Sequence, residues 1–452
     1  MENPYLQEGE EVFEELKDVK SVPQAKSKKK KAGYCVLAIV LAFLCFFGGF
    51  GVCWLSLDSE MRSLIRLKDK MQEEYYKDIS DEQFYDTIFG AINDNLLDDY
   101  SAYMTAEEYD AIISAGKGNN SGIGVALITK TDDEQDVLYI RRICGNSPAE
   151  KAGLAIGDCI VGFGTNPEQM IRSVSYAEFD AFLSKRENNE KFYLQVENTL
   201  ELKTVEIYKT RFLENCVFYR TNDSSYRFTG DDKEDRVAVG NPLAMPYDWA
   251  YIRLTQFNKN ASDEFDGAME LFKAEGKKHL VLDLRGNGGG YMGVLESIAK
   301  YFCKDASTRQ PVVAVADYGE DKETFKADAN LYYEYFSANS RVCLLADVET
   351  ASASEGLIGC MLDYATISYG DICLSSHFGA TKTFGKGIMQ TTYPIRLLKG
   401  DAVRLTTATV YWPMSNRCIH GRGVLPEDGT KTASGNYTDD ELKNAFLALG
   451  IN

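Results

Sequence analysis

Histidine is scarce in this sequence: its 452 residues include three, His279, His377 and His420. Catalysis by a serine and a histidine therefore has few candidates for the group that takes the serine's proton. The eleven cysteines are scattered, and no two follow the Cys-x-x-Cys spacing typical of zinc sites. We therefore expect no bound metal. Whether any disulfides form is left open by the sequence.

Positive charge is also in deficit, since the formal net charge is −19. Residues 1–57 contain seven acidic and seven basic side chains, so the whole excess of negative charge belongs to residues 58–452. Binding to phosphate backbones requires a basic surface. Nucleic acid is therefore excluded as an expected partner of residues 58–452.

Charge of either sign is missing from residues 32–57, a run of 26 residues, whereas about 20 apolar residues suffice to span a bilayer. Four lysines at 28–31 precede this run, and Asp58 and Glu60 follow it. The positive-inside rule then places residues 1–31 in the cytoplasm and residues 58–452 outside. A cleaved signal peptide is the alternative, but its apolar run is normally shorter and ends in an Ala-x-Ala-like site. We predict an uncleaved single-pass anchor in the cell membrane.

The remainder of the chain divides at changes in composition. Residues 58–118 predict a helical region, and the glycine-rich stretch 116–122 marks a domain boundary. Residues 119–212 contain short strand patterns and form a predicted β-rich domain. Residues 213–247 are polar and predict a connector. Residues 248–452 alternate apolar strands with helices, including a helical stretch expected at 322–336, and predict a mixed α/β domain.

The β-rich domain carries a helix signal beside a glycine turn. Ser147 is placed to cap a short helix with Pro148 at its first position and Glu150 at its third, and Gly153 ends it. With the Gly157-Asp158 turn, this block resembles a PDZ domain of the bacterial protease type. Its carboxylate-binding loop matches the following four residues: Gly122, Ile123, Gly124 and Val125.

Such a loop frees backbone N–H groups to hold a terminal carboxylate, while the strand that follows adds a peptide to its edge. The alternative is a glycine turn before an ordinary strand.

A serine-rich segment opens a predicted helix in the last domain. Ser352 and Ser354 follow an apolar strand and precede apolar residues at helical spacing. A serine at such a position faces backbone N–H groups and the positive end of the helix dipole, which stabilise an oxyanion. The alternative is that these serines only cap the helix.

Lys386 is the second candidate for chemistry. Gly385 and Gly387 flank it, and burial could hold its amine neutral so that it acts as a base. Gln390 lies on the same face of the expected strand and could orient the amine. The alternative is an ordinary solvated lysine.

Arg285 begins a third segment, the glycine-rich turn 285–290, which follows an apolar strand. Strand, glycine turn and helix are also the outline of a phosphate loop, but no Gly-Lys-Ser/Thr ends this run, so a nucleotide site is not expected.

Six blocks, in order and spacing, resemble the C-terminal processing peptidases, also called tail-specific proteases. The Ser-Ala-Ser-Glu block at 352–355 and the Phe-Gly-Lys-Gly-x-x-Gln block at 384–390 are the most specific. The resemblance implies a protease core of the ClpP and crotonase spiral type with an inserted PDZ domain and no cofactor. It also implies that Ser352 is the nucleophile, Lys386 the general base and Gln390 its support, with the N–H groups of Ala353 and Gly289 as oxyanion donors. The blocks are residues 97–109, the PDZ signature, and residues 280–290, 351–364, 383–390 and 405–426.

Three departures from the family pattern are visible. Gly286 stands where the family's turn, Arg-Asn-Asn-Pro-Gly-Gly or Arg-Asn-Asn-Gly-Gly-Gly, has its first asparagine. The segment between Asp363 and Lys386 is longer by about residues 370–377, and the 213–247 connector is enlarged. None of these changes removes a candidate catalytic residue.

The sequence thus predicts a membrane-anchored serine endopeptidase that acts outside the cytoplasm on proteins or peptides bound by their C-terminal tails. Two alternatives remain: an inactive PDZ scaffold or sensor, and a serine-histidine hydrolase that uses His377. A homo-oligomer is compatible with the sequence, which does not fix the oligomeric state.

Overall fold

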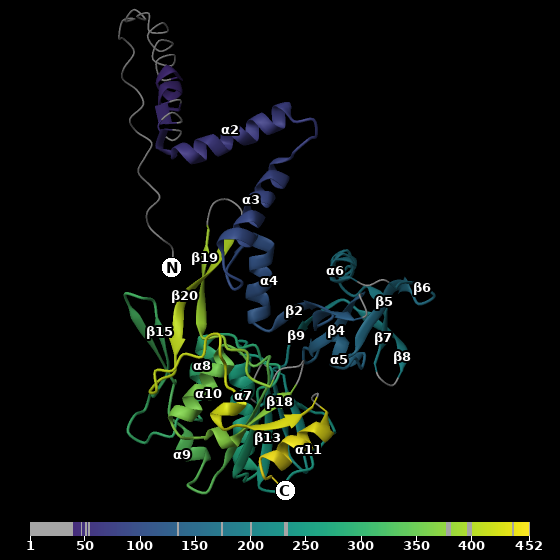
Figure 1. The fold of residues 1–452 in the computed structure, drawn as a ribbon, viewed down its shortest axis with the longest axis vertical. Helices are drawn as coiled ribbons and strands as arrows, with labels where there is room; N and C mark the ends of the chain where they lie inside the picture. The colour runs from purple at the N-terminus through teal and green to yellow at the C-terminus, as the bar shows by residue number, and fades with distance from the viewer. Residues whose placement is uncertain are drawn as a thin grey trace, which may run out of the picture. The chain divides into compact units, whose positions relative to one another are not determined.

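The computed structural model describes residues 39–46, 48–49, 52, 55–132, 135–172, 175–198, 201–229, 234–376, 381–395, 400–435 and 438–451. The chain divides into two compact units, Met1–Gly90 and Ala91–Asn452 (Figure 1). The predicted tail 1–31, part of the predicted span 32–57, and His377 lie outside the described residues. Within the part of the chain that the structure describes, no helix has both the length and the apolar character needed to cross a membrane.

Two helices dominate the described part of the first unit. α2 (Ser59–Glu74) begins after Asp58, whose carboxylate accepts a hydrogen bond from the Met61 N–H at 2.7 Å. α3 (Asp81–Leu96) begins in this unit and ends in the next. Lys68 of α2 forms an ion pair with Asp81 of α3 at 2.8 Å. The predicted helical region after residue 58 is therefore present.

A six-stranded antiparallel sheet forms the β-rich region predicted at 119–212. The strand order is β3-β4-β5-β7-β8, with β6 paired to β5, so β3 is an edge strand. Ser147 caps α5 as predicted, since its Oγ accepts from the Glu150 N–H at 3.1 Å. The elements are β3 (Val125–Asp132), β4 (Gln135–Ile143), α5 (Pro148–Lys151), β5 (Cys159–Asn166), β6 (Gln169–Ile171), α6 (Tyr176–Ser184), β7 (Lys191–Glu197) and β8 (Leu202–Tyr208).

The chain enters and leaves this region at neighbouring points. β2 (Asn119–Gly122) pairs antiparallel with β9 (Thr210–Leu213), so that the first and last residues of the region lie side by side. Before it lie β1 (Ala102–Met104) and α4 (Ala106–Gly116), which Thr105 caps. An arrangement with adjacent ends is expected of a domain inserted into another.

An eight-stranded sheet, ordered β12-β11-β10-β13-β14-β17-β18-β21, forms the centre of the remaining chain. β13, β14, β17, β18 and β21 are parallel. Of these, β14 and β17 have the continuous apolar runs that are typical of buried parallel strands. The prediction that residues 213–247 form a connector is wrong, because residues 217–238 supply the three antiparallel strands at one edge of this sheet. The strands are β10 (Val217–Arg220), β11 (Ser225–Phe228), β12 (Arg236–Ala238), β13 (Trp249–Leu254), β14 (His279–Asp283), β17 (Val342–Ala346), β18 (Ile372–Ser376) and β21 (Lys431–Ser434).

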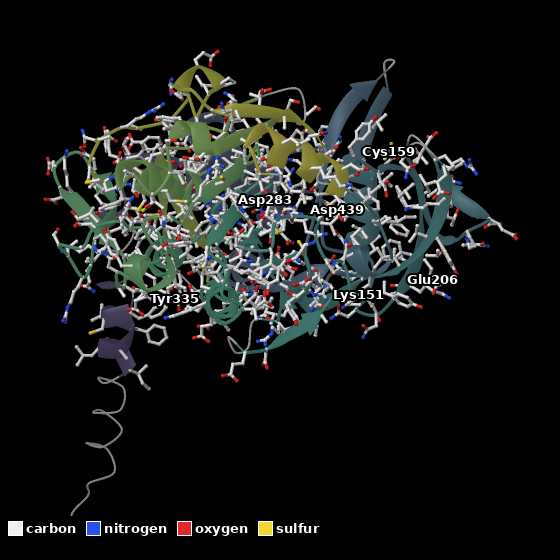
Figure 2. All side chains as sticks on the ribbon, turned by 90° about the horizontal axis from the view of Figure 1, so that it is seen from below. Lys151, Cys159, Glu206, Asp283, Tyr335 and Asp439 are labelled. Carbon is white, nitrogen blue, oxygen red and sulfur yellow. The ribbon has the colours of Figure 1, made fainter. Side chains whose placement is uncertain are left out.

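Helices cover both faces of this sheet, and alternate strand residues face each side. In β14, Leu280 and Leu282 belong to the larger core with α7, α8 and α10, whereas Val281 packs with α11. Figure 2 shows how densely side chains fill this interior, where Asp283 is labelled. The helices are α7 (Ala261–Ala274), α8 (Met292–Ala299), α10 (Ala353–Asp363) and α11 (Asp439–Ala448).

A smaller sheet lies beside this core, with the order β1-β20-β15-β16 and β19 paired to β20. The helix expected at 322–336 is wrong over most of its length. Residues 322–326 are the second strand of a hairpin, whose turn contains Gly319 at φ +93° and a hydrogen bond from the Tyr318 N–H to the Asp321 carbonyl. The elements are β15 (Val312–Asp317), β16 (Lys322–Lys326), α9 (Tyr332–Tyr335), β19 (Ile388–Pro394) and β20 (Ala402–Tyr411), with short 3-10 turns at Tyr369–Asp371 and Pro426–Asp428.

Candidate active site

Ser352 lies in a strained backbone conformation between β17 and α10. Its φ of +59° and ψ of −119° are rarely adopted by a residue with a side chain and cost roughly 1–3 kcal/mol. Such strain persists only where the surroundings enforce it, and it is frequent at functional sites. The other candidate, Ser354, is fully buried and donates its Oγ–H to the Asn287 carbonyl at 3.0 Å. Ser352, which is half-buried, is therefore the better placed nucleophile of the two.

The glycine-rich turn follows β14 and lies against Ser352. Gly289 has φ +95°, and a Cβ there would stand 2.8 Å from the Ser352 Cβ and the Ala353 nitrogen, so only glycine fits. Gly286 has φ +72°. Asparagine tolerates this left-handed region better than most residues, so the glycine that replaces the family's asparagine keeps the same backbone.

A buried ion pair joins the end of β14 to the start of this turn. The Arg285 guanidinium donates two hydrogen bonds to the Asp283 carboxylate, at 2.9 and 2.7 Å, and both side chains are buried. Burial is the largest single influence and would raise the pKa of Asp283, but the charge and hydrogen bonds of Arg285, the Arg253 charge and the Tyr251 hydroxyl together lower it. The carboxylate is thus charged and accepts a further hydrogen bond from the Tyr251 hydroxyl at 2.6 Å.

Lys386 lies in the short loop before β19. Burial lowers the pKa of its amine, the Arg404 charge lowers it further, and Asp98 and Glu355 act in the opposite direction. The ring of Tyr100 covers the amine, with the Nζ 5.0 Å from the ring centroid. The predicted shift toward a neutral lysine therefore has a structural cause.

Glu355 connects the segments that carry Ser352 and Lys386 through its fully buried carboxylate. One oxygen accepts from the Ser352 N–H at 3.1 Å and the Lys386 N–H at 2.8 Å. The other accepts from the Thr383 hydroxyl at 2.6 Å and the Gly385 N–H at 2.8 Å. A single carboxylate thus fixes the backbone of the serine relative to that of the lysine.

A cavity of about 320 Å³ brings four of the predicted residues together: Ser352, Ala353, Lys386 and Gln390 all line it. Among the described residues, no hydrogen bond joins Ser352 Oγ to Lys386 Nζ, and the Gln390 amide donates to Thr406 Oγ1 at 3.3 Å. The rest of the wall is largely apolar, and includes Met292, Leu295, Val410, Trp412 and Ile419.

The predicted oxyanion donor Gly289 is placed differently from Ala353. Its N–H donates to Asn287 Oδ1 at 2.9 Å, and Gly288 and Gly290, not Gly289, line the cavity. Use of the Gly289 N–H by a substrate would require it to turn away from Asn287. The assignment of this particular glycine stays a prediction.

Two further hollows continue from the cavity, one after the other. One of about 270 Å³ shares Gln256, Gly288 and Lys386 with it, and is also lined by Arg142 and Ala126. These last two residues also line a groove of about 500 Å³ that contains the predicted carboxylate loop, Gly122, Ile123, Gly124 and Val125. The hollows thus form a series from the edge strand β3 to Ser352.

An ion pair flanks this series. Arg141 of β4 pairs with Glu349, three residues before Ser352, and both line the middle hollow. Neither residue stands out in the sequence. Tyr100, Glu355 and Asn287 are also functional candidates that sequence reasoning missed, although each lies within a block that resembles the family. Their contacts join segments distant in the chain, which local patterns do not reveal.

No histidine is found among the described residues that line the catalytic cavity. His279 lies at the start of β14, where its ring stacks on Trp249. His420 contacts the Tyr100 ring at 6.5 Å between centroids. The serine-histidine alternative therefore depends on His377, which lies outside the described residues.

Comparison with known proteins identifies the part of the chain that carries this site. Residues 248–428 match the model of peptidase family S41. This part of the chain is a peptidase family S41 domain. Both Ser352 and Lys386 fall inside the S41 domain, so the family match and the cavity designate the same region. The chain is thus a serine peptidase, as the sequence predicted.

Curated relatives extend the similarity beyond the S41 domain. A probable CtpA-like serine protease of Staphylococcus saprophyticus is 26% identical over 440 residues, covering 93% of this chain and 79% of the relative. A protein of the same description from Staphylococcus epidermidis is 26% identical over 371 residues, covering 80% of this chain and 64% of the relative.

Solved structures with the same fold include the photosystem II D1 C-terminal processing protease, with a TM-score of 0.50 and 20% identity over 85% of this chain and 90% of that one. A putative S41 protease from Bacteroides fragilis has a TM-score of 0.50 and 15% identity over 83% of this chain and 90% of that one. The mixed α/β fold around the S41 domain is thus shared with peptidases.

Proposed function

We propose that the chain is an endopeptidase that cleaves proteins or peptides held by their C-terminal tails, through Ser352 as nucleophile and Lys386 as general base. The observation that carries this proposal is the cavity lined by both residues, with the serine on a strained turn and the lysine partly desolvated. Lys386 would take the Ser352 proton as Oγ attacks the scissile carbonyl, and would return it to the leaving amine. The resulting acyl-enzyme would be hydrolysed by water.

The developing oxyanion would be stabilised by backbone donors. Ala353 is the first residue of α10 and lines the cavity, as do Gly288 and Gly290 of the glycine-rich turn. Removal of one such donor typically lowers the rate by about 100-fold or more. Gln390 is proposed to support the lysine from the same wall.

The β-rich region is proposed to act as a PDZ domain. Its groove lies between the edge strand β3 and residues of α6, including Phe179 and Leu183. An edge strand offers unpaired backbone groups that a peptide can join. The glycine loop at 122–125 begins this strand, which is where a terminal carboxylate would be held. The chained hollows then provide a route from the bound tail to Ser352.

Anchorage by residues 32–57, with the catalytic domain outside the cytoplasm, is proposed from the charge pattern alone. The uncharged run follows four lysines and precedes Asp58 and Glu60. Deletion of residues 1–57 should move the protein from the membrane to the soluble fraction. If the variant that lacks residues 1–57 still sediments with membranes, the proposed anchor is wrong.

The test of function uses the purified full chain and a long synthetic peptide that ends in small apolar residues. We expect cleavage when the peptide has a free C-terminal carboxylate. Amidation of that carboxylate should lower kcat/KM by about 10- to 100-fold, because hydrogen bonds to a charged group contribute about 1.5–3 kcal/mol. A short peptide that contains only the cleaved segment is the control and should respond little to amidation. Tail binding without any cleavage would favour the inactive scaffold.

The pH profile should respond to the two charges beside Lys386. The lysine must be neutral to accept a proton, so kcat/KM falls as the pH drops below the pKa of its amine. Arg404→Gln removes a charge that lowers this pKa, so the acidic limb should move to higher pH. Asp98→Asn removes a charge that raises it, so the limb should move to lower pH. If the acidic limbs of the two variants' pH profiles do not shift in opposite directions, the titrating group is not Lys386.

A further inference from the structure

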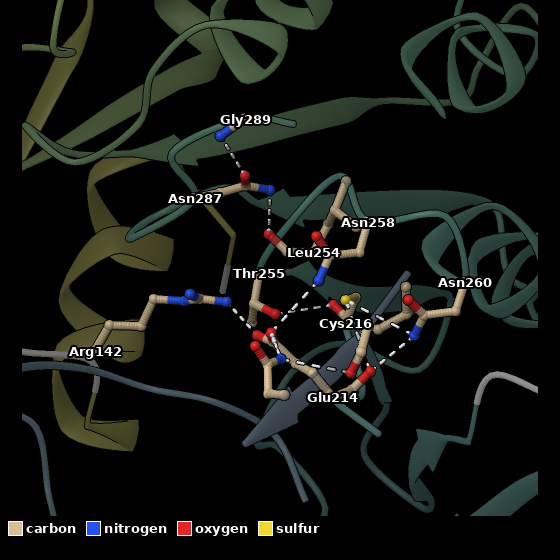
Figure 3. A network of polar contacts seen from close by, with 12 residues as sticks. Arg142, Glu214, Cys216, Leu254, Thr255, Asn258, Asn260, Asn287 and Gly289 are labelled. Atoms are coloured by element: carbon tan, nitrogen blue, oxygen red, sulfur yellow. Dashed lines mark hydrogen bonds and ion pairs between the residues drawn. The ribbon is translucent and has the colours of Figure 1, made fainter. Parts of the chain in front are cut away.

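Asn287, in the glycine-rich turn, uses every polar group it has, although no chemistry is assigned to it. Its side chain is fully buried. Nδ2 donates to the Leu254 carbonyl at 2.8 Å, and Oδ1 accepts from the Gly289 N–H at 2.9 Å. Figure 3 shows the carboxamide between these two residues. Its own N–H donates to the Leu284 carbonyl at 3.1 Å.

The Asn287 carbonyl extends this set of bonds to the serine. It accepts from the Ala351 N–H at 3.0 Å and from Ser354 Oγ at 3.0 Å. These two residues flank the pair Ser352 and Ala353. Asn287 therefore ties the end of β13, the glycine turn and the start of α10 to one another.

The proposed oxyanion site is formed by two of the segments that Asn287 joins. Gly288 and Gly290 of the first segment and Ser352 and Ala353 of the second all line the cavity. The backbones of Gly289 and Ala353 lie close together, since a Cβ at Gly289 would be 2.8 Å from the Ala353 nitrogen. The direction of the Ala353 N–H depends on the backbone between 351 and 354, and this backbone is strained at Ser352.

We propose that Asn287 is a positioning residue that sets the geometry of the oxyanion site, with Ser354 as its partner on α10. The proposal rests on the proposed function, because it assumes attack by Ser352. Asn287 touches no substrate; it acts through the backbone of Ala353 and of the glycine turn. Preorganised donors accelerate a reaction only if their placement is maintained as charge develops, so loosening them should weaken transition-state binding more than substrate binding.

The experiment compares a peptide aldehyde with the corresponding peptide alcohol as inhibitors of the full chain. The aldehyde forms a hemiacetal with the serine, whose oxygen takes the oxyanion position, whereas the alcohol only fills the same site. For Asn287→Ala we expect the inhibition constant of the alcohol divided by that of the aldehyde to fall about tenfold or more. This quotient is the ratio of inhibition constants used below. We expect kcat to fall by about 10- to 100-fold, with KM within about threefold of the parent.

Ser354→Ala provides a second, gentler variant, because it removes one hydrogen bond to Asn287 and leaves the asparagine in place. It should lower the inhibitor ratio in the same direction and by less. Asn260→Ala is the matched control. Asn260 is also a buried asparagine, and its Nδ2 donates to the Glu214 carbonyl at 2.7 Å and to Glu264 Oε1 at 2.8 Å, but it does not line the cavity. This control should lose thermal stability without a change in the ratio.

A merely structural role for Asn287 would give the pattern of the control: a lower Tm and an unchanged ratio of inhibition constants. That result would overturn the proposal. If Asn287→Ala does not fold, Ser354→Ala decides, and an unchanged ratio in that variant would also overturn it. Failure of the proposed function itself would give a different result. Ser352→Ala would then still cleave, and the parent chain would bind the aldehyde no better than the alcohol.

Discussion

Replacement of Ser352 by alanine should lower kcat by about 10⁴-fold or more while the fold and substrate binding are retained. The reason is that, among the described residues that line the cavity, Ser352 is the only serine, threonine or cysteine, and it lies on the strained turn. Ser354→Ala is the control, since Ser354 is fully buried and bonded to Asn287. Its loss should be about tenfold. The measurement is single-turnover cleavage of a tail-bearing peptide, with Tm and peptide binding recorded for each variant.

Lys386→Ala should be as damaging as Ser352→Ala, because the two groups act as a unit in the same step. The double variant should then be no worse than either single one. Lys386→Arg is the sharper control, since a guanidinium keeps the positive charge and cannot be deprotonated in proteins. It should be as inactive as the alanine variant if the lysine is a base, and largely active if only its charge is needed.

If Lys386→Ala still cleaves, Lys386 is not the general base, and His377 becomes the candidate for that role. His377→Ala separates these cases, because the serine-lysine mechanism predicts that this variant keeps its activity. If Ser352→Ala itself remains active with full tail binding, the serine assignment is wrong. Equal loss in the Ser354→Ala control would show that the serines act through the structure of the turn.

Much of the fold could be predicted because its signals are local. The cap formed by Ser147, the proline after it and the left-handed Gly153 at φ +71° give the same short helix in sequence and structure. The apolar runs of β14 and β17 predict buried parallel strands, and glycine follows β14 where the backbone must turn. Each of these features is decided by residues within a few positions of one another.

Errors arose where the decisive partner is distant. Residues 217–238 are polar because one edge of the central sheet is more exposed than its centre, so composition alone suggested a connector. Residues 322–326 appear helical with the segment that follows, but pairing with β15 makes them a strand. Secondary structure of this kind is set by tertiary contacts that override local preference.

The candidate site divides in the same way. Ser352 and Lys386 could be proposed from their flanking residues and a family resemblance. The positive φ of Ser352, the Tyr100 ring over Lys386 and the four bonds of Glu355 depend on segments far apart in the chain. The assignment of Gly289 stays a prediction, since which N–H of a glycine turn faces the cavity depends on peptide orientations that the sequence does not report.

Glu355 should be the most sensitive residue of the site after the serine and the lysine themselves. Glu355→Ala leaves four buried or half-buried donors without their acceptor: the N–H groups of Ser352, Gly385 and Lys386, and the Thr383 hydroxyl. Each unsatisfied donor costs about 1–3 kcal/mol, so with partial relaxation we expect a loss of about 3–5 kcal/mol in the free energy of unfolding. The corresponding fall in Tm is about 10 °C.

Activity per folded molecule should fall as well, by about 100-fold. The carboxylate holds the backbone of the nucleophile against that of the base, and a misplacement of about 1 Å in such a pair costs a rate factor of that order. Glu264→Ala is the matched control. Glu264 is another fully buried carboxylate, which accepts from the N–H groups of Cys216 and Val217 at 2.7 and 2.8 Å and does not line the cavity. It should lose stability and keep its activity.

Glu355→Gln tests the charge separately from the shape. Burial raises the pKa of Glu355, although hydrogen bonds from Thr383 and from the N–H groups of Lys386, Gly385 and Ser352 oppose the shift. A raised folded pKa means that the folded chain binds a proton more tightly than the unfolded chain. Stability should therefore decrease as the pH rises from the ordinary value of 4.5 through the raised pKa, and this decrease should be absent in the glutamine variant.

The decisive comparison is between Glu355→Ala and Glu264→Ala at equal fractions of folded protein. If the two lose kcat equally, the effect of Glu355 is general destabilisation and not the junction between serine and lysine. If Glu355→Ala alone loses kcat, with KM for the tail-bearing peptide unchanged, the loss lies in the chemical step. That outcome is expected because the groove at 122–125 and the bonds of Glu355 involve different residues, so tail binding should be maintained while the serine and lysine lose their mutual position.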